Sequence, residues 1–529
     1  MKYSCSRLLA AVCAGFVSLV SFGQNAPTFT SVVSPNGPSP AHVYAIDVNN
    51  DGLSDIVQSG IIPNATTAFF TVSINQGNGI FAPPVSYTVN AGTWPGLTSA
   101  DFNGDGKVDI AFALPGTTQA AVYLGNGDGT FQSPTTTTVD LPSGYTFATS
   151  SVVASDFNHD GNIDLVAAGY QNNDPYAGPW AIFLLYGDGQ GHFTSPTIIY
   201  QPTSGWVVDT LVTGDFDSDN NADVALMEYL PCGDGATVCI GNTWKSNVLT
   251  LFGDGTGSFD AIDVTTITGA MSLAAADLNN DAATDLYGVE YMADPTTTQL
   301  AVFLGHYGRQ FGYRFTALPP DMNIGSPLVA ADFDGTASWA IAGLSSSYSG
   351  SGSTYNNQMV YFLGAGNDST ATIVTGPTPG GSNTEFQTGL VVGHFKGDVS
   401  PDIAINETAQ GNSPTTTTAA GLNTTQGYYG PCNYPASGRG ISVCIPPATN
   451  PAGPVRFGAS ANSYGQLRKM ELWVDGAKLA EQHWNWGPAS YFDWTWTNPS
   501  PGTHSATIFA ADTDNTLQRS DFTFSVGSQ

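Results

Sequence analysis

The stretch Asp101-Phe-Asn-Gly-Asp-Gly-Lys-Val-Asp-Ile110 carries the pattern that decides the fold of this chain. Oxygen-bearing side chains stand at its first, third, fifth and ninth positions, and glycine stands at the sixth. This is the beginning of a calcium loop, in which these oxygens turn inward, the glycine makes a sharp bend and the carbonyl of position 7 joins the ligands. An EF-hand would need a bidentate glutamate at position 12 and flanking helices. Here β-forming residues follow the ninth position, so the loop leads into a strand.

The same pattern recurs along the chain at nearly constant spacing. The first residues of seven copies lie 54, 55, 59, 62, 55 and 62 positions apart, which predicts a repeat architecture. Two copies are worn: the one at Asp332 lacks the later acids, and the one at His394 has Lys396 at position 3. In the order of positions 1, 3, 5, 7 and 9, the predicted ligands are Asp47, Asn49, Asp51, Leu53 and Asp55; Asp101, Asn103, Asp105, Lys107 and Asp109; Asp156, Asn158, Asp160, Asn162 and Asp164; Asp215, Asp217, Asp219, Asn221 and Asp223; and Asp277, Asn279, Asp281, Ala283 and Asp285.

Calcium is the cation that this pattern favours. Clustered carboxylates repel one another by several kcal/mol for each pair about 4 Å apart at an effective dielectric of about 20, and a bound cation removes this penalty. Ordinary Asx-turns would not keep oxygens at the same four offsets in five copies. Magnesium prefers fewer protein ligands and more water. We therefore expect about five Ca²⁺ ions in structural, non-catalytic sites.

Each repeat continues with an apolar run, a glycine turn and a phenylalanine, as at 120–131, 181–193 and 248–259. Gly-Asp-Gly between apolar runs indicates a hairpin, because glycine adopts positive φ at little cost. Each unit then contains four short strands: one before the metal loop, one after it, and the hairpin. Four-stranded units repeated in a ring form a β-propeller. We predict seven blades, with six or eight left open by the worn copies, and expect 27–33 to pair with the seventh unit and close the ring.

These motifs resemble the FG-GAP/VCBS repeat family, the propeller type of the integrin α-subunit head, over about residues 27 to 425. The resemblance implies one Ca²⁺ in each intact loop on one rim of the ring, and ligand binding by loops on the opposite rim. Ala282 departs from the family pattern, which has glycine at that position. In the seventh copy, Lys396 puts an ammonium group where a cation would sit.

Beyond about residue 430 the repeat ends and tryptophan becomes dense. Alternating apolar stretches and a tight Asp475-Gly476 turn predict six or seven strands in the last 95 or so residues. This number suits a β-sandwich, and the segment is similar to bacterial Ig-like domains. The predicted organisation is a signal peptide at 1–23, a seven-bladed propeller at 24–428 and an Ig-like sandwich at 429–529.

The N-terminal segment has the features of a secretory signal. Lys2 and Arg7 precede an apolar core that is too short to span a bilayer. A lipid anchor at Cys13 is disfavoured because Val12 stands where a small residue is needed. We expect a secreted or cell-surface protein without a transmembrane segment in the mature chain. Disulfides suit an exported chain better than zinc, since no histidine lies near the remaining cysteines; the expected pairs are Cys232 with Cys239 and Cys432 with Cys444.

Charge and composition narrow the function. A formal charge of −30 argues against nucleic acid and anionic membrane as partners. The seven histidines are scattered, and no HExxH or GxSxG motif occurs, so catalysis is not the expected role. Tryptophan and tyrosine in loops can stack on sugars or peptides, which favours extracellular recognition or cell adhesion with a carbohydrate or protein ligand. The alternatives are a polysaccharide-active lyase or hydrolase that gathers residues from several blades, and a purely structural scaffold.

Overall fold

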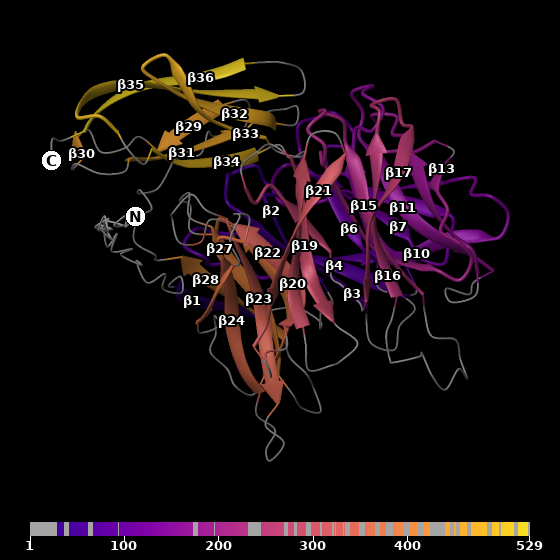
Figure 1. The fold of residues 1–529 in the computed structure, drawn as a ribbon. Helices are drawn as coiled ribbons and strands as arrows, with labels where there is room; N and C mark the ends of the chain where they lie inside the picture. Colours follow the sequence, from indigo (N-terminus) through magenta and orange to yellow (C-terminus); the bar gives the residue numbers. More distant parts are fainter. Residues whose placement is uncertain are drawn as a thin grey trace, which may run out of the picture.

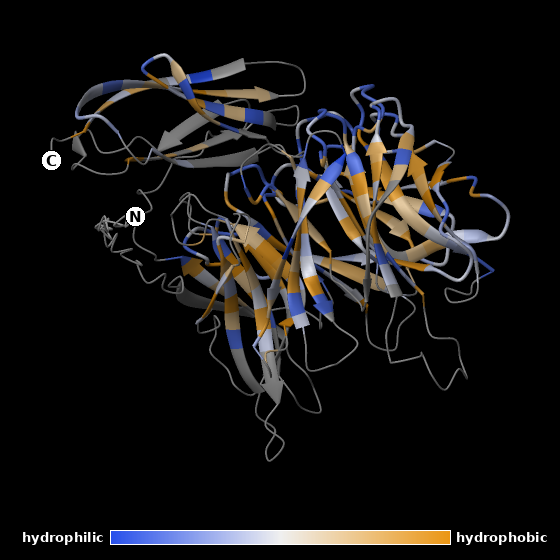
Figure 2. Cartoon of the chain, in the orientation of Figure 1, coloured by the Kyte–Doolittle hydropathy of each residue, from blue (hydrophilic) through white to orange (hydrophobic). Residues whose placement is uncertain are grey.

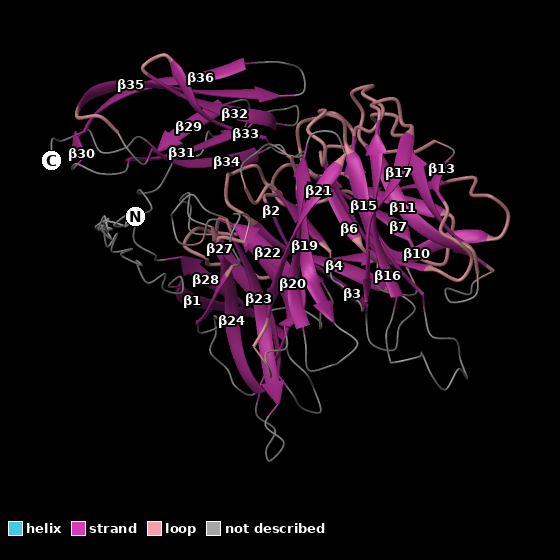
Figure 3. Cartoon of the chain, viewed as in Figure 1, coloured by secondary structure: helices cyan, strands magenta, loops and turns pink. Residues whose placement is uncertain are grey.

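The computed structural model describes the chain in a series of ranges separated by short gaps. All regular secondary structure within these ranges is β, in 36 strands (Figure 3), and no helix there has the length and hydropathy of a membrane span. The ranges are 29–35, 42–61, 67–91, 93, 95–172, 178–194, 196–230, 245–268, 273–279, 283–291, 298–306, 309–319, 322, 324–331, 333, 339–348, 355–365, 371–376, 385–395, 401–409, 416–423, 440–444, 449–450, 455–462, 467–483, 489–496, 499–512 and 517–526.

Seven four-stranded antiparallel sheets follow one another along the chain and resemble propeller blades (Figure 1). We number them sheet 1 to sheet 7. They consist of β2 (His42–Ile46), β3 (Asp55–Ile61), β4 (Ala68–Ser73) and β5 (Val85–Val89); β6 (Leu97–Ala100), β7 (Asp109–Leu114), β8 (Gln119–Tyr123) and β9 (Thr135–Thr138); β10 (Tyr145–Ser155), β11 (Asp164–Gln171), β12 (Trp180–Leu185) and β13 (Thr197–Tyr200); β14 (Val207–Gly214), β15 (Asp223–Leu230), β16 (Lys245–Gly253) and β17 (Phe259–Thr268); β18 (Ala274–Ala276), β19 (Asp285–Tyr291), β20 (Thr298–His306) and β21 (Gln310–Ala317); β22 (Ile324–Ala331), β23 (Ala340–Tyr348), β24 (Tyr355–Leu363) and β25 (Thr372–Gly376); and β26 (Glu385–Gly393), β27 (Asp402–Ala409), β28 (Thr416–Asn423) and β1 (Phe29–Pro35).

The seventh sheet takes its fourth strand from the start of the chain. β1 pairs antiparallel with β28, from Phe29 opposite Asn423 to Pro35 opposite Thr417. The predicted pairing of the N-terminal segment with the last repeat is therefore confirmed. The four-strand content of each unit is confirmed as well, with the predicted metal loops joining the first and second strands.

The middle strands of the sheets are buried on both faces. Every residue of β4, β7 and β12 is buried, whereas the outer strand β9 alternates between half-buried and exposed threonines. Continuous apolar runs of this kind are expected where a sheet is covered on both sides. Figure 2 shows the hydrophobic colours in the strands and the hydrophilic colours in the loops at one end of the sheets.

Seven hydrophobic clusters of described residues fill the spaces between neighbouring sheets. One of them lies between sheet 7 and sheet 1. A phenylalanine at position 2 of a metal loop often meets the hairpin phenylalanine of the following sheet, which explains why both residues recur in the repeat. The ring centroids are 5.8 Å apart for Phe102 and Phe193, 5.8 Å for Phe157 and Phe259, 6.3 Å for Phe216 and Phe311, and 5.6 Å for Phe395 and Phe81.

Eight further strands form two sheets beyond the repeats. The three-stranded sheet holds β29 (Gly440–Cys444), β31 (Val455–Asn462) and β34 (Ala489–Trp496); the five-stranded sheet holds β30 (Thr449–Asn450), β32 (Leu467–Val474), β33 (Ala477–His483), β35 (Gly502–Asp512) and β36 (Leu517–Val526). One core joins them, with Trp494 stacked on Phe457 at 6.4 Å. The turn at Asp475 and Gly476 has φ of 51° and 80°, as predicted for a tight hairpin.

Candidate metal centres

Four of the predicted calcium loops lie fully within the part of the chain that the structure describes. We call them loop 1 (47–55), loop 2 (101–109), loop 3 (156–164) and loop 4 (215–223). Each runs from the end of the first strand of its sheet to the start of the second. Position 6 is left-handed in all four, with φ of 86°, 81°, 89° and 67° at Gly52, Gly106, Gly161 and Asn220, so it takes glycine or asparagine.

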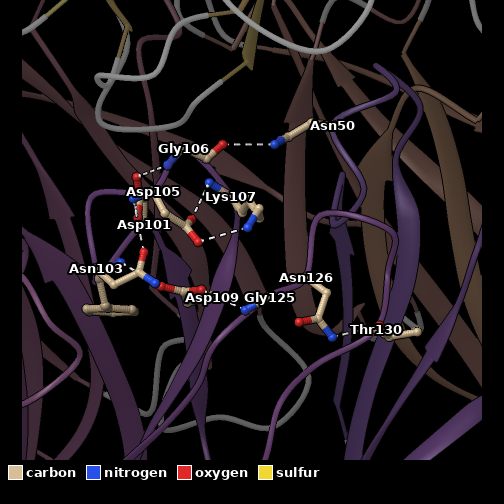
Figure 4. Close-up of polar contacts among 11 residues, drawn as sticks. Asn50, Asp101, Asn103, Asp105, Gly106, Lys107, Asp109, Gly125, Asn126 and Thr130 are labelled. Atoms are coloured by element: carbon tan, nitrogen blue, oxygen red, sulfur yellow. Dashed lines mark hydrogen bonds and ion pairs between the residues drawn. The ribbon is translucent and has the colours of Figure 1, made fainter.

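Loop 2 shows how the first aspartate orders its own loop (Figure 4). The N–H groups of Asp105 and Gly106 donate to the two carboxylate oxygens of Asp101 at 3.1 and 2.7 Å. The same two bonds, from positions 5 and 6 to position 1, recur in the other three loops. A carboxylate at position 1 is therefore held in place by backbone donors.

Positions 3, 5 and 7 of loop 2 are linked in a chain. Asn103 Oδ1 accepts the N–H of Asp105 at 3.0 Å, and Asp105 Oδ1 accepts the N–H of Lys107 at 3.0 Å. Asp105 Oδ2 also pairs with Lys107 Nζ at 3.0 Å. The position 7 residues Leu53, Asn162 and Asn221 donate their N–H to position 5 in the same way.

The aspartate at position 9 does something that the sequence did not reveal. Its side chain is fully buried, Oδ2 accepts the N–H of position 2, and Oδ1 accepts an N–H at the end of the third strand of the same sheet. It therefore clamps the loop to the sheet in six repeats, including the worn seventh. The distances to Oδ2 and Oδ1 are 3.0 and 2.7 Å at Asp55, 2.9 and 2.7 Å at Asp109, 3.1 and 2.9 Å at Asp164, 2.8 and 2.8 Å at Asp223, 2.8 and 2.8 Å at Asp285, and 2.8 and 2.7 Å at Asp402.

Loop 4 brings three carboxylates together. One oxygen each of Asp215, Asp217 and Asp223 lies within 4.8 Å of the others, and the group can hold a metal ion such as Ca²⁺. Asp217 is 4% exposed, and its Oδ1 is buried without a hydrogen-bond partner. A buried carboxylate oxygen without a donor is unfavourable, and a cation in this position would satisfy it.

Burial raises the pKa values of the loop carboxyl groups, and the neighbouring aspartates raise them further. The pKa reaches about 7 for Asp47, about 8 for Asp55, about 7 for Asp109 and Asp164, about 6 for Asp215 and about 9 for Asp223. A divalent cation would reverse this trend, because it favours the ionised carboxylates and releases their protons.

Other predicted residues are placed only in part. In the fifth loop (277–285), Asp277 and Asn279 are half-buried, Ala283 and Asp285 are buried, and Asp281 lies outside the described residues, as does Ala282. Asp332, Lys396 and the cysteines Cys232, Cys239 and Cys432 also lie outside them, and only the backbone of Cys444 is described, in β29. His159, predicted to face solvent from loop 3, is exposed.

Neighbouring loops also touch across sheet boundaries. Asn50 of loop 1 donates its side-chain amide to the carbonyl of Gly106 in loop 2 at 3.0 Å (Figure 4). Hairpin turns reach the loop of the preceding sheet: Gly191 and Gly257 donate their N–H to the carbonyls of Phe102 and Phe157 at 3.1 and 3.0 Å. The loops thus belong to one continuous network at the junctions between sheets.

Comparison with protein families supports the repeat assignment. Residues 101–167 and 156–226 match the FG-GAP-like repeat. The chain carries FG-GAP-like repeats. These two matches contain loops 2, 3 and 4.

No curated protein matches the chain. Solved structures match it at low identity. An extracellular domain described as that of a one-component system of B. thetaiotaomicron is 9% identical, with 95% of this chain and 59% of that chain covered and a TM-score of 0.39. An endo-arabinase from Bacteroides thetaiotaomicron is 11% identical, with 63% and 95% covered and a TM-score of 0.30. Prolyl oligopeptidase B from Galerina marginata is 11% identical, with 82% and 56% covered and a TM-score of 0.36. The match thus spans about three fifths of the first of these chains.

Proposed function

We propose that this protein is an exported, calcium-stabilised β-propeller of seven blades that serves extracellular recognition or adhesion. Seven blade-like sheets, seven clusters between them and the pairing of β1 with β28 support a closed ring at 24–428. Two sheets around one core support an Ig-like sandwich at 429–529. The signal peptide at 1–23 and the two disulfides belong to the same proposal and rest on the sequence alone.

The observation that carries the calcium proposal is the carboxylate cluster of loop 4. Asp215, Asp217 and Asp223 converge within 4.8 Å, and Asp217 Oδ1 has no donor. Loops 1 to 3 share the backbone bonds that hold position 1 and position 9, so we extend the assignment to them and to the fifth loop, for about five ions. Each ion would neutralise buried carboxylates and tie its loop to the adjoining strands, which makes the ring rigid.

A surface suited to ligand binding lies on sheet 5. Tyr313 and Phe315 are 45% and 46% exposed and stand at alternate positions of β21, so they share one face of the strand. Both rings pack edge-on to buried Phe303, at 5.7 and 6.4 Å. Aromatic rings that are fixed on one side and open on the other suit stacking on a sugar ring or an apolar protein side chain.

The test combines metal analysis with ligand screening. Protein that has never met a chelator should contain about five calcium ions per chain, and EDTA should lower its melting temperature. A glycan array and a panel of extracellular proteins, with and without EDTA, should give calcium-dependent hits that the double variant Tyr313→Ala and Phe315→Ala weakens. Release of reducing ends from a glycan hit would instead indicate a polysaccharide-active enzyme. Calcium without any ligand would indicate a structural scaffold, and absence of calcium would overturn the proposal.

A further inference from the structure

The hairpin turn of sheet 5 departs from a rule that the described turns of sheets 1 to 4 follow. In sheets 1 to 4 the residue two positions before the hairpin phenylalanine is a left-handed glycine, with φ of 69°, 82°, 82° and 82° at Gly79, Gly129, Gly191 and Gly257. In sheet 5 the same position holds Arg309, also left-handed, with φ of 64°. A side chain in this conformation is unfavourable, so Arg309 has to be held by its contacts.

Those contacts lie in sheet 4. Arg309 Nε donates to Asp217 Oδ2 at 3.2 Å, and Nη1 donates to Asp260 Oδ2 at 2.9 Å. The guanidinium lies over the ring of Phe252, 5.2 Å from its centroid. Arg309 thus reaches from the hairpin of one sheet into the metal loop of the preceding sheet.

Loop 4 differs from the other predicted loops at the residue that Arg309 contacts. Position 3 is aspartate here, whereas the other four loops have asparagine: Asn49, Asn103, Asn158 and Asn279. Loop 4 therefore holds four aspartates where each of the others holds three. One guanidinium brings the formal charge of loop 4 from −4 to −3, which is that of loop 1, loop 3 and the fifth loop; loop 2 carries Lys107 besides its three aspartates. Among the five loops, loop 4 has the extra aspartate, and loop 4 is the loop that Arg309 contacts.

We propose that Arg309 is a tethered cation that partly replaces calcium in loop 4. This inference rests on the proposed calcium binding. Asp217 Oδ2 is already paired with the guanidinium, Oδ1 is buried without a hydrogen-bond partner, and one oxygen of Asp217 lies within 4.8 Å of Asp215 and Asp223. A calcium ion in the cluster would share the Asp217 carboxylate with the guanidinium, and two cations on one carboxylate repel each other. Loop 4 therefore binds calcium more weakly than it would without Arg309, and depends on calcium less.

The test is Arg309→Gln in the full chain. Calcium titration by calorimetry should show one site whose Kd falls about tenfold, which corresponds to about 1.4 kcal/mol. In EDTA the melting temperature of the variant should lie below that of the wild type, so the difference between calcium and EDTA widens. Arg309→Lys keeps the charge and should retain the weaker site. The double variant Asp217→Asn and Arg309→Gln gives loop 4 asparagine at position 3 and no guanidinium, as in the other loops. It should recover most of the stability that Arg309→Gln loses in EDTA.

Arg314→Gln removes a positive charge from β21, the strand that follows Arg309, and is the control. Arg314 donates to the carbonyl of Tyr313, so its loss should leave the calcium isotherm unchanged. An unchanged or weaker calcium site in Arg309→Gln would overturn the role of Arg309, because a purely structural ion pair would lower stability equally with and without calcium. Wild-type protein that binds no calcium would overturn this role and the proposed function together.

Discussion

Replacement of Asp402 by asparagine separates the clamp made by position 9 from metal binding. Asp402 is fully buried and accepts the N–H groups of Phe395 and Asn423 at 2.8 and 2.7 Å. The seventh repeat keeps this clamp although Lys396 stands at position 3 of its loop. Any effect of Asp402→Asn on stability should therefore be independent of calcium.

The expected magnitude follows from the two bonds. A hydrogen bond to a charged group contributes about 1.5 to 3 kcal/mol, and an unsatisfied buried donor costs about 1 to 3 kcal/mol. Asparagine keeps one acceptor oxygen and turns an amide NH₂ toward the other N–H. We expect a loss of about 3 kcal/mol, which corresponds to a decrease in Tm of about 5 °C for a unit of this size.

Differential scanning calorimetry in calcium and in EDTA provides the assay. The decrease for Asp402→Asn should be the same in both buffers. The matched control is Asp109→Asn in loop 2, where the same clamp adjoins a proposed calcium site, so its decrease should be larger in calcium than in EDTA. A change below about 1 kcal/mol at Asp402, or one that disappears in EDTA, would refute the idea that position 9 acts as a clamp independent of metal.

Three further predictions concern pH and packing. In EDTA, the free energy of unfolding should fall as pH rises from about 4 to about 9, because the pKa of Asp223 is raised from 3.8 to about 9 and the bound proton stabilises the folded state. Thermal melts across this pH range with and without calcium check this prediction. Calcium should remove the fall in stability. The buried His504 lies between Asp475 Oδ2 and the carbonyl of Ser500, both at 2.7 Å; burial lowers its pKa, but these hydrogen bonds outweigh burial and raise it above 6.5. Stability from this group is thus present below pH 6.5 and lost as pH rises above its folded-state pKa, and His504→Gln should flatten that part of the melting profile. Gly125→Ala would drive a methyl group into the carbonyl of Val108 and should cost at least about 2 kcal/mol. Chemical unfolding measures this against Gly312→Ala, whose methyl would come no closer than 3.3 Å to a neighbouring atom and whose φ is not positive.

The sequence predicted the repeats and the loops because their chemistry is local. Aspartate and glycine at fixed offsets, such as Asp101 and Gly106, are needed within nine residues of one another, and the pattern recurs often enough to be recognised. The hairpins, and the pairing of β1 with the last sheet, were predicted from the same repeat. The all-β class was therefore predictable without any knowledge of contacts.

The roles that escaped prediction depend on partners far away in the chain. Position 9 was predicted as a ligand, but its clamp includes an N–H up to 30 residues further on, as for Gly253 with Asp223. Arg309 and Asp217 lie 92 positions apart, and nothing in the sequence pattern joins them. Such pairs are set by how strands pair within a sheet and by how one sheet packs on the next, which a linear pattern does not encode.

The pairing of β1 with β28 has a consequence for biogenesis. Translation proceeds from the N-terminus, so β1 is made early and its partner β28 is made about 390 residues later, since Phe29 pairs with Asn423. Pairings between such distant segments form slowly because the intervening chain must first be ordered. Until then β1 and β28 are open edges that invite pairing with another chain. Nascent molecules should therefore need protection from aggregation until synthesis has passed residue 423, and the finished seventh sheet should then hold both ends of the repeat region against fraying.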